Sequence, residues 1–566
     1  MRITAFPLRP ATSTVAGQQI GALKWKVFDA TDWIGKEVQT KRREFLYLMG
    51  GLTGLATPAG IGQPLLETGK AQGTSYGIIG MYVHQHWPYN HPYCARTWTV
   101  EDYRGYADGL TKLGYNTLLI WPVLETMPSP LTPSDVANLN KVARVIDMLH
   151  GEFKMRVWVA LCPNVAANDA EAAKYPFEKR HFFYCDRRVN PADPTAVSRM
   201  IKWYEELLRP LAQIDAMTVI DSDPGGYPGS TNAEFVNLLV EYRQMLNRLR
   251  PGIELYYWMH AGWEAYCRFY QTGEFKWGTA EEARDTLTRL QALNPEPWGI
   301  TVNTLSSLFP PPDRTHLAVA SKLGLGPRAV GFSYGAIEGE PTFPMTNFGG
   351  SNAQKAGQTK GPRGVVGNAQ THCLQLPNTF AFARGAMGKP VDEADYSEFA
   401  EDLIDRQGQA IVKAWQALAG ENSAAKRDMA EKLAGMSKGQ LQSGRLRGLL
   451  FGDPKRFITD LVMQLRLKAS FDDFVAAMKK DRDFKPSFRS FVTAAKAWQR
   501  QHGYECAWQW PDLKETLKGL KSPTIDALLD EKGEGKTPFD RLEDQLRKTE
   551  TFTLRLIVAM EHALRA

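Results

Sequence analysis

Two aspartates two positions apart close an apolar stretch of the chain. Asp221 and Asp223 end the segment 215–223, and a Pro-Gly-Gly turn follows directly. Residues two apart on a strand share a face and lie about 6–7 Å from one another, because the rise is about 3.3 Å per residue. Carboxylates this close push their pKa values apart, so that one keeps a proton while the other stays ionised. The spacing predicts acid/base chemistry, with Asp223 as the general acid and Asp221 orienting it or the substrate.

Further side chains able to bind or activate a substrate stand at the ends of other apolar runs, whose starts are mostly apolar. A polar end shared by so many runs predicts one common site rather than scattered surface loops. The set comprises the carboxylates Glu338 and Glu340, the rings Trp121, Trp258 and Tyr334, the imidazoles His84, His86, His260 and His372, and the amides Asn164, Asn303, Asn368 and Gln370.

The segments that must position these residues alternate between β-rich runs and amphipathic helices from residue 76 onward. Eight β-rich runs separated by helix-like segments predict parallel strands joined by crossovers. An α/β fold of the (β/α)8 TIM barrel type fits residues 76–391, and such barrels place their active sites at the C-terminal ends of the strands. The alternative is a doubly wound open sheet, but no Gly-rich phosphate loop follows the first run. The runs are 76–86, 116–125, 154–164, 215–223, 253–260, 298–304, 328–335 and 363–370.

Alternation along the fourth run assigns its two faces. Asp221 and Asp223 share a face with Met217 and Val219, since side chains alternate along a strand. We expect this face to line the barrel interior, with the intervening residues against the surrounding helices. Between the seventh and eighth runs, the Gly- and Lys-rich segment 348–364 is predicted to be a mobile loop at the rim of the site.

With these positions assigned, the chain resembles the large superfamily of barrel glycosidases, whose acid/base group follows strand four and whose second carboxylate follows strand seven. The pairs Asp221/Asp223 and Glu338/Glu340 occupy those two places. The first pair also resembles the hexosaminidases, in which one carboxylate orients the acetamido group of the substrate and its neighbour protonates the leaving oxygen. The resemblance implies a glycoside hydrolase acting on N-acetylhexosamine-type or related sugars. The end of strand four carries neither the Asn-Glu pair nor the Asp-Glu pair of the common families.

The resemblance also implies a role for each group of residues. Asp223 protonates the glycosidic oxygen, and Glu338, with Glu340 as its rival, stabilises the oxocarbenium-like state or activates water. Carboxyl groups about 5–5.5 Å apart give retention of configuration, and a separation of about 6.5–9.5 Å gives inversion. The aromatic rings stack on a sugar face, and the histidines and amides bind hydroxyls. No metal and no cofactor is expected.

Two other functions stay open. His84 and His86 resemble the His-x-His start of metal-dependent amidohydrolase barrels, and His260, His372 and the two aspartates of the fourth run could complete a zinc site. Strand six supplies no histidine for that pattern, and strand four ends in no lysine. A barrel that binds carbohydrate without cleaving it is the third candidate. No dinucleotide fingerprint or cluster-forming cysteine spacing points to an oxidoreductase.

The two ends of the chain differ from its middle. Residues 1–60 contain the pair Arg42-Arg43 and then a mildly apolar run reaching Ala59, which resembles a twin-arginine export signal. We therefore expect export to the periplasm or the cell exterior. Residues 392–566 contain amphipathic helices and no comparable strand run. They predict a helical C-terminal domain, through which a homodimer could form.

Composition limits the partners. The 566 residues carry a net charge of +6 without a Lys/Arg tract, which argues against nucleic acid. Apart from the export signal, no segment reaches the roughly 20 apolar residues of a membrane span. The 15 Trp and 20 Tyr residues favour a carbohydrate partner, because flat amphipathic rings hold polyhydroxylated ligands well.

Overall fold

The computed structural model describes residues 76–565 apart from 87–88, 181–185, 223, 305–315, 334–336, 338–350, 370–372, 481, 504–512 and part of 538–550. The predicted export signal in residues 1–60 lies outside the described residues. The barrel and the helices that follow it belong to one compact unit, Phe45–Ala566. The division of this unit into domains at 391/392 stays a prediction.

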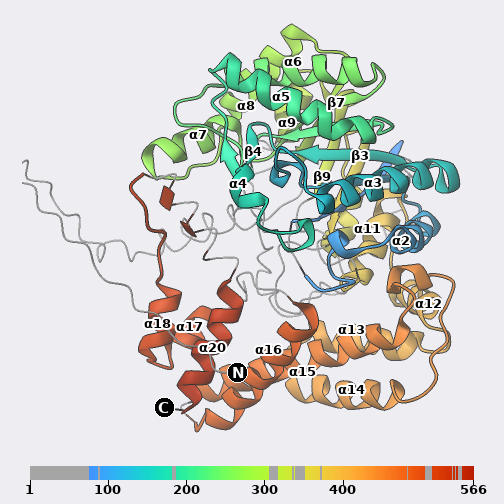
Figure 1. The fold of residues 1–566 in the computed structure, drawn as a ribbon. Helices are drawn as coiled ribbons and strands as arrows, with labels where there is room; N and C mark the ends of the chain where they lie inside the picture. The colour runs from blue at the N-terminus through green and yellow to red at the C-terminus, as the bar shows by residue number, and fades with distance from the viewer. Residues whose placement is uncertain are drawn as a thin grey trace, which may run out of the picture. The chain divides into compact units, whose positions relative to one another are not determined.

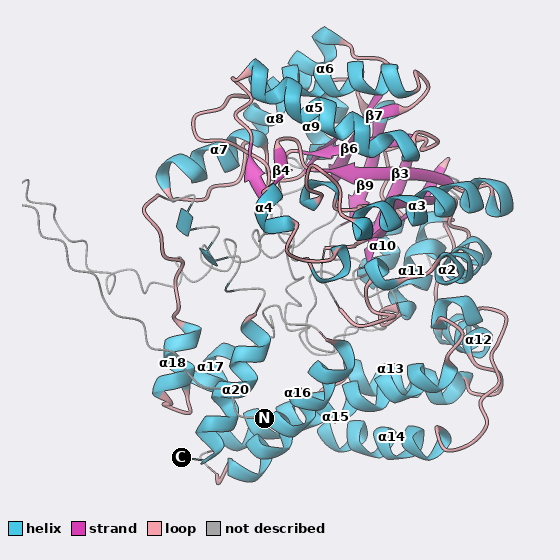
Figure 2. Ribbon diagram, viewed as in Figure 1, coloured by secondary structure: helices cyan, strands magenta, loops and turns pink. Residues whose placement is uncertain are grey.

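Eight parallel strands close into a barrel, which confirms the predicted (β/α)8 TIM barrel (Figure 1). The order around the barrel is β1-β10-β9-β8-β7-β6-β3-β2, so neighbours in space follow the order of the chain. Figure 2 shows the strands in magenta with helices packed around them. Each predicted β-rich run contains one of these strands. They are β1 (Ile78–Val83), β2 (Thr117–Ile120), β3 (Arg156–Leu161), β6 (Ala216–Ile220), β7 (Glu254–Met259), β8 (Trp298–Asn303), β9 (Ala329–Ser333) and β10 (Gly364–Ala369).

Helices alternate with the strands, and several begin at the same local signal. A Thr side chain accepts from the backbone N–H three residues on, while the acidic residue there accepts from the Thr backbone, which satisfies two donors at the helix start. This capping box starts α2, α3, α6 and α8 at Thr99, Thr132, Thr231 and Thr279. The helices of the barrel are α2 (Val100–Leu113), α3 (Pro133–Met148), α5 (Pro194–Leu208), α6 (Asn232–Leu249), α7 (Trp263–Thr272), α8 (Ala280–Leu293), α9 (His316–Lys322), α10 (Ser351–Gly357) and α11 (Leu376–Ala386).

The faces of β6 are the reverse of those predicted from the sequence. Ile220 is in register with Trp258, whose ring contacts Tyr82 and Phe332 on distant strands of the closed barrel, so this face is the interior. Thr218 and Ile220 therefore point inward, and the expectation that Met217, Val219 and Asp221 line the interior is wrong. Both faces of a parallel strand are buried and apolar, so the sequence of the run does not indicate which face points into the barrel.

The long β3–α5 connection carries a small hairpin at the C-terminal end of the barrel. β4 (Val165–Ala167) pairs antiparallel with β5 (Asp186–Arg188), and the short helix α4 (Asp169–Ala172) follows β4.

The segment 348–364 is not wholly a loop, because it contains α10. This helix packs on α11 at very close range. A Cβ on Gly357 would lie 2.2 Å from the carbonyl oxygen of Phe382, and a Cβ on Gly385 would lie 2.1 Å from that of Gln354. Only glycines permit this approach of the two backbones. The packing against α11 thus overrides the loop-like composition of the segment.

From α12 onward the regular elements of the described chain are helices, as predicted for the C-terminal region. Among the described helices, none is long and apolar enough to pass through a lipid bilayer. The helices are α12 (Glu393–Leu403), α13 (Gly408–Ala419), α14 (Ser423–Met436), α15 (Pro454–Lys479), α16 (Lys485–His502), α17 (Leu513–Lys518), α18 (Pro523–Leu529) and α20 (Phe552–Arg565).

Hydrogen bonds fasten the β1–α2 loop to two of these late helices. The backbone N–H of Asn90 donates to the carbonyl of His502 at the end of α16, at 2.9 Å. Its side-chain amide donates to the carbonyl of Arg500 at 3.0 Å. The hydroxyl of Tyr93 donates to Asp460 of α15 at 2.6 Å. The loop that follows β1 is therefore held in place by the C-terminal helices.

Candidate active site at the C-terminal end of the barrel

Four packed rings, which we call the aromatic floor, close the barrel interior near the C-terminal ends of the strands. They are Tyr82, Trp121, Trp258 and Phe332, and all are buried. The ring of Tyr82 lies 5.7 Å from that of Trp258 and 5.7 Å from that of Phe332, and Trp258 and Phe332 are 4.3 Å apart. Trp121 joins Trp258 at 6.1 Å. The predicted site residues Trp121 and Trp258 are thus brought together.

His84 and His86 follow β1 and bond to each other beside this floor. Nε2 of His84 lies 2.6 Å from Nδ1 of His86, and the His86 ring packs against Trp121 at 4.2 Å. The backbone N–H of His86 donates to Nδ1 of His84 at 3.3 Å. Because an N–H can only donate, Nδ1 of a neutral His84 accepts and its proton sits on Nε2. That proton is donated to His86, whose own proton is then also on Nε2.

Arg96 holds the loop that carries this histidine pair. Its guanidinium donates to the carbonyls of Gln85 and His86, both at 2.8 Å, and to that of Phe177 at 3.0 Å. It also donates to the carbonyl of Arg180. Burial first, and the charge of Arg96 second, hold the pKa of His86 well below its ordinary value of 6.5. The imidazole of His86 is therefore neutral at physiological pH.

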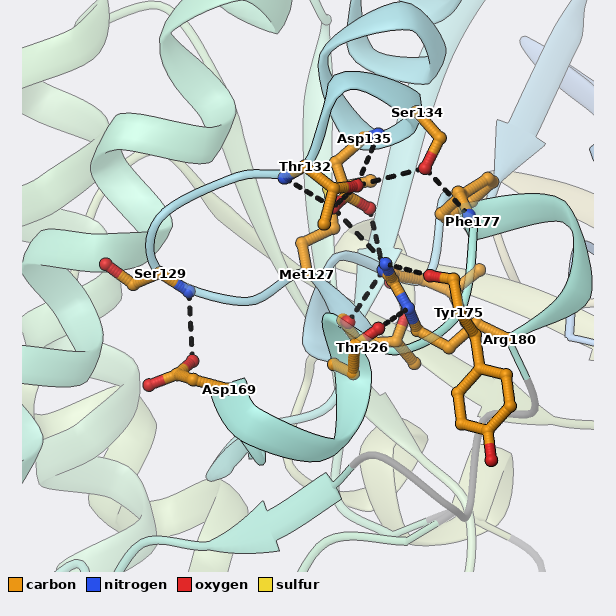
Figure 3. A network of polar contacts seen from close by, with 12 residues as sticks. Thr126, Met127, Ser129, Thr132, Ser134, Asp135, Asp169, Tyr175, Phe177 and Arg180 are labelled. Carbon is orange, nitrogen blue, oxygen red and sulfur yellow. Dashed lines mark hydrogen bonds and ion pairs between the residues drawn. The ribbon is translucent and has the colours of Figure 1, made fainter.

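A second buried arginine, Arg180, joins the loops after β2 and β3 (Figure 3). It donates to Asp135 of α3 at 2.6 Å and to the carbonyl of Thr126 at 2.9 Å. It also donates to the carbonyl of Ala172 at 3.0 Å. Arg180 and Asp135 form an ion pair with both side chains fully buried. Since Arg96 binds the carbonyl of Arg180, the loops after β1, β2 and β3 form one connected wall.

Asp221 is turned away from the interior and holds the loop after β7. Its carboxylate accepts from the hydroxyl of Tyr257 at 3.0 Å. It also accepts from the backbone N–H groups of His260, Ala261 and Gly262 at 3.1–3.2 Å. Burial raises the pKa of Asp221 to about 6, although these donors act in the opposite direction. The carboxylate thus fixes the position of the β7–α7 loop.

Ser222 lies just beyond the end of β6, two residues after the inward-facing Ile220, and was missed in the sequence predictions. Its Oγ lies 2.7 Å from Nδ1 of His260, and Asn303 donates to the carbonyl of His260 at 3.3 Å. Burial, followed by the neighbouring His316, lowers the pKa of His260 to about 3. The predicted residues His260 and Asn303 are therefore brought together, with His260 neutral. A polar residue directly after Asp221 was the only sequence signal for Ser222.

Glu125 is a second buried carboxyl group at this end of the barrel that the predicted set omitted. Oε1 accepts from the indole N–H of Trp121 at 3.1 Å and from the backbone N–H of Cys162 at 2.5 Å. Oε2 has no hydrogen-bond partner among the described residues. Burial raises the pKa of Glu125 to about 7 against the effect of these donors. Near neutral pH this group can both hold and release a proton.

The predicted amides fall into two groups. Asn368 is paired in register with Tyr82, on the interior face of β10. Neither its side-chain nitrogen nor its oxygen has a partner among the described residues, and the same holds for the side-chain oxygen of Asn303. Asn164 is instead engaged with the protein, donating to the carbonyls of Val189 at 2.8 Å and Gly226 at 2.9 Å. Asn164 therefore ties the β4–β5 hairpin to the loop after β6.

Six of the predicted site residues lie outside the described residues, so their roles stay predictions. Among the residues that the structure describes, no group of three or more His, Cys, Asp or Glu side chains is arranged to hold a metal ion. The zinc alternative includes two undescribed residues in its ligand set and also stays a prediction. The six are Asp223, Tyr334, Glu338, Glu340, Gln370 and His372.

Comparison with known proteins finds only remote similarity, and some of the similar solved structures are glycoside hydrolases. No protein-family model and no curated protein matches it. A family 89 glycoside hydrolase from Clostridium perfringens, in complex with PUGNAc, is 9% identical, with a TM-score of 0.47 over 87% of this chain and 63% of that chain. A family 138 enzyme targeting pectin rhamnogalacturonan II is 10% identical, with a TM-score of 0.43 over 76% of this chain and 63% of that one.

A third similar structure is an O-GlcNAc hydrolase from Thermobaculum terrenum. It is 10% identical, with a TM-score of 0.39 over 87% of this chain and 94% of that one. This chain spans less than two thirds of the length of the family 89 and family 138 enzymes. The structural neighbours thus include glycoside hydrolases, and the exact family is not identified. Similarity this remote transfers neither a substrate nor a mechanism to this chain.

Proposed function

We propose that this protein is a glycoside hydrolase that binds its carbohydrate at the C-terminal end of the barrel. The observation that carries the proposal is Asn368, a fully buried amide beside the aromatic floor with no partner among the described residues. A buried polar group without partners costs free energy unless a ligand supplies the missing hydrogen bonds. Amides next to flat rings suit the hydroxyls and the apolar face of a sugar.

Cleavage of a glycosidic bond needs a carboxyl group that is protonated near neutral pH and can reach the leaving oxygen. Asp223 is the acid we propose, because it follows the end of β6 and the described Asp221 is occupied with the β7–α7 loop. Glu125 is its rival, because its pKa is about 7. Glu338 or Glu340 supplies the second carboxylate, and N-acetylhexosamine-type sugars are the first substrates to try.

The test is hydrolysis of aryl glycosides, N-acetylhexosaminides included, by the purified protein with and without EDTA. We expect release that survives EDTA and falls at least about 100-fold in Asp223→Asn. Asn368→Ala should weaken saccharide binding, measured by calorimetry, while the fold is retained.

The other outcomes are informative in their own right. If Glu125→Gln abolishes release and Asp223→Asn does not, Glu125 is the acid. Activity lost with EDTA and restored by zinc would replace the glycosidase with a metal-dependent hydrolase. Saccharide binding without release from any substrate would indicate a barrel that binds carbohydrate and does not cleave it.

A further inference from the structure

A second site candidate lies far from the strands in sequence, between α16 and α20. A surface groove of about 440 Å³ runs between these helices, with Arg489, Lys496 and Arg500 from α16 and Arg565 from α20 along it. Glu561 is the single carboxylate of the lining. We call this feature the basic groove. Four cations against one carboxylate give it a formal charge of +3.

The cations of the basic groove already converge on a carboxylate. Lys496 forms an ion pair with Glu561. Lys496 chiefly, and Arg565 and Arg500 less strongly, hold the pKa of Glu561 below its ordinary value. Three cationic side chains thus act electrostatically on this one carboxylate, and Arg489 adds a fourth cation to the same groove. The lining therefore carries more positive charge than Glu561 neutralises.

A groove of similar size on the barrel does not share the excess of positive charge. The groove between α5 and α6 encloses about 420 Å³ and carries the cations Lys202, Arg209 and Arg248. Three glutamates balance them, and Glu205 alone pairs with Arg248 at 2.8 Å and with Arg209 at 3.8 Å. We call this feature the balanced groove. It is neutral in sum, so it serves as an internal control.

Chemistry and position together indicate the ligand. Both walls of the basic groove are helices, whose backbone groups are already paired, so no peptide strand can add to them. Its apolar lining is limited to Val492, Ala497 and Leu564, too little to anchor an amphipathic helix. The α16 wall ends at Arg500, whose carbonyl is bound by Asn90 of the loop that carries the histidine pair. A charged chain held in the groove therefore lies along a helix that is fastened to a loop of the proposed carbohydrate site.

We propose that the basic groove binds a polysaccharide that carries carboxylate groups, of the polyuronate type. Guanidinium groups bind carboxylates in a bidentate manner, and the hydroxyl of Thr493, which donates to the carbonyl of Arg489 at 2.8 Å, can accept from a sugar hydroxyl,. Along the axis of α16, the backbone positions of Arg489 and Lys496 are about 10 Å apart and those of Lys496 and Arg500 about 6 Å apart, from the 1.5 Å rise per residue, so carboxylates spread along one chain can each meet a cation. The choice of a polysaccharide rests on the proposed function of the barrel.

The test is binding of a purified oligogalacturonate to the whole protein, measured by calorimetry at low and at physiological salt. We expect binding that weakens with salt, because exposed ion pairs are screened. The triple variant Arg489→Gln, Lys496→Gln, Arg500→Gln should bind at least about tenfold more weakly. The matched triple variant of the balanced groove, Lys202→Gln, Arg209→Gln, Arg248→Gln, should bind as the unmodified protein does. The fully methyl-esterified oligomer should not bind.

Equal binding by the two triple variants, or by the methyl ester, would overturn the proposal. So would poly-glutamate binding as tightly as the oligogalacturonate, since the groove would then accept any acidic chain. Failure of the proposed glycosidase function would give a different result, namely that no glycoside is hydrolysed. Binding of oligogalacturonate by Asp223→Asn, with an intact basic groove, separates the two results.

Discussion

Nε2 of His84 lies 2.6 Å from Nδ1 of His86, and the contact has a direction. The backbone N–H of His86 donates to Nδ1 of His84, so a neutral His84 carries its proton on Nε2 and donates it to Nδ1 of His86,. The ring of His86 then carries its own proton on Nε2, where it can donate a hydrogen bond,. In this arrangement both nitrogens of His84 and Nδ1 of His86 are occupied, so the zinc alternative would require the pair to separate.

The tautomers of the two rings are directly measurable. In protein labelled with ¹⁵N at histidine, we expect His84 and His86 to carry their protons on Nε2, and His86 to stay neutral well below pH 6.5. The unfolded ring takes up a proton near pH 6.5 and the folded ring only at lower pH, so the contribution of His86 to stability is present above pH 6.5 and is lost progressively as the pH falls from there through the lowered folded pKa,. An Nδ1–H signal from either ring would contradict the direction of the contact.

Glu125→Gln should change how stability depends on pH. The pKa of Glu125 rises from 4.5 to about 7 on folding, so the folded state holds a proton that the unfolded state has released. The stability from this group is present below pH 4.5 and lost as the pH rises toward 7. Relative to the unmodified protein, Glu125→Gln should therefore gain about 2–3 kcal/mol between pH 5 and pH 8. Urea unfolding at both pH values measures it, and parallel curves would exclude the raised pKa.

The main effect of Asp221→Asn should be a lower free energy of unfolding rather than a direct effect on catalysis. The carboxylate accepts from three consecutive backbone N–H groups, and an amide would turn a donor toward some of them. We expect a loss of about 2–4 kcal/mol in the free energy of unfolding, measured by chemical denaturation. Asp223→Asn is the matched comparison, with lower kcat and an unchanged unfolding midpoint. An Asp221→Asn protein of full stability and no activity would show that Asp221 acts on the substrate.

The buried pair Arg180–Asp135 should behave differently in single and double variants. Removing one partner leaves a buried charge uncompensated, which costs about 3–5 kcal/mol. Arg180→Met and Asp135→Leu should each unfold at much lower urea concentration, and the double variant should recover part of the loss. A double-mutant cycle on the free energy of unfolding provides the measurement. Additive effects would mean that the pair is not coupled.

The export proposal has a test that does not depend on the barrel. Replacing Arg42-Arg43 by two lysines should leave the full-length precursor in the cytoplasm, because the signal is read through its arginine pair. Lys41→Gln, directly before the pair, is the matched control and should be exported normally. Fractionation and immunoblotting measure both. Export of the double-lysine variant would show that Arg42-Arg43 is not the signal.

The fold could be predicted from the sequence more fully than the faces of its strands. Alternating β-rich and amphipathic runs are a property of the local chain, and all eight strands lie within the predicted runs. Whether Ile220 or Asp221 faces inward depends on register with Trp258 across the barrel, which no local pattern records. The same holds for α10, whose helical state depends on packing Gly357 against α11.

At the site, the sequence indicated which residues stand at the ends of the strands. It did not indicate which residues from distant loops contact them. The structure brings His84, His86, Trp121 and Trp258 together, and their roles stay predictions. The hydrogen bonds of Arg96 and the raised pKa of Glu125 could not be predicted, because both result from burial against loops that are distant in sequence. Arg96, for example, meets Phe177 across 81 residues of chain.

The attachment of the β1–α2 loop to α16 also determines when this loop can fold during synthesis of the chain. Asn90 bonds to a residue 410 positions later in the chain. At about 5–20 residues per second, synthesis of that stretch takes roughly 20–80 s. During this interval the loop that carries the histidine pair has been made but its anchor has not. The first βα-loop of the barrel can therefore reach its final form only after the chain as far as Arg500 of α16 has left the ribosome.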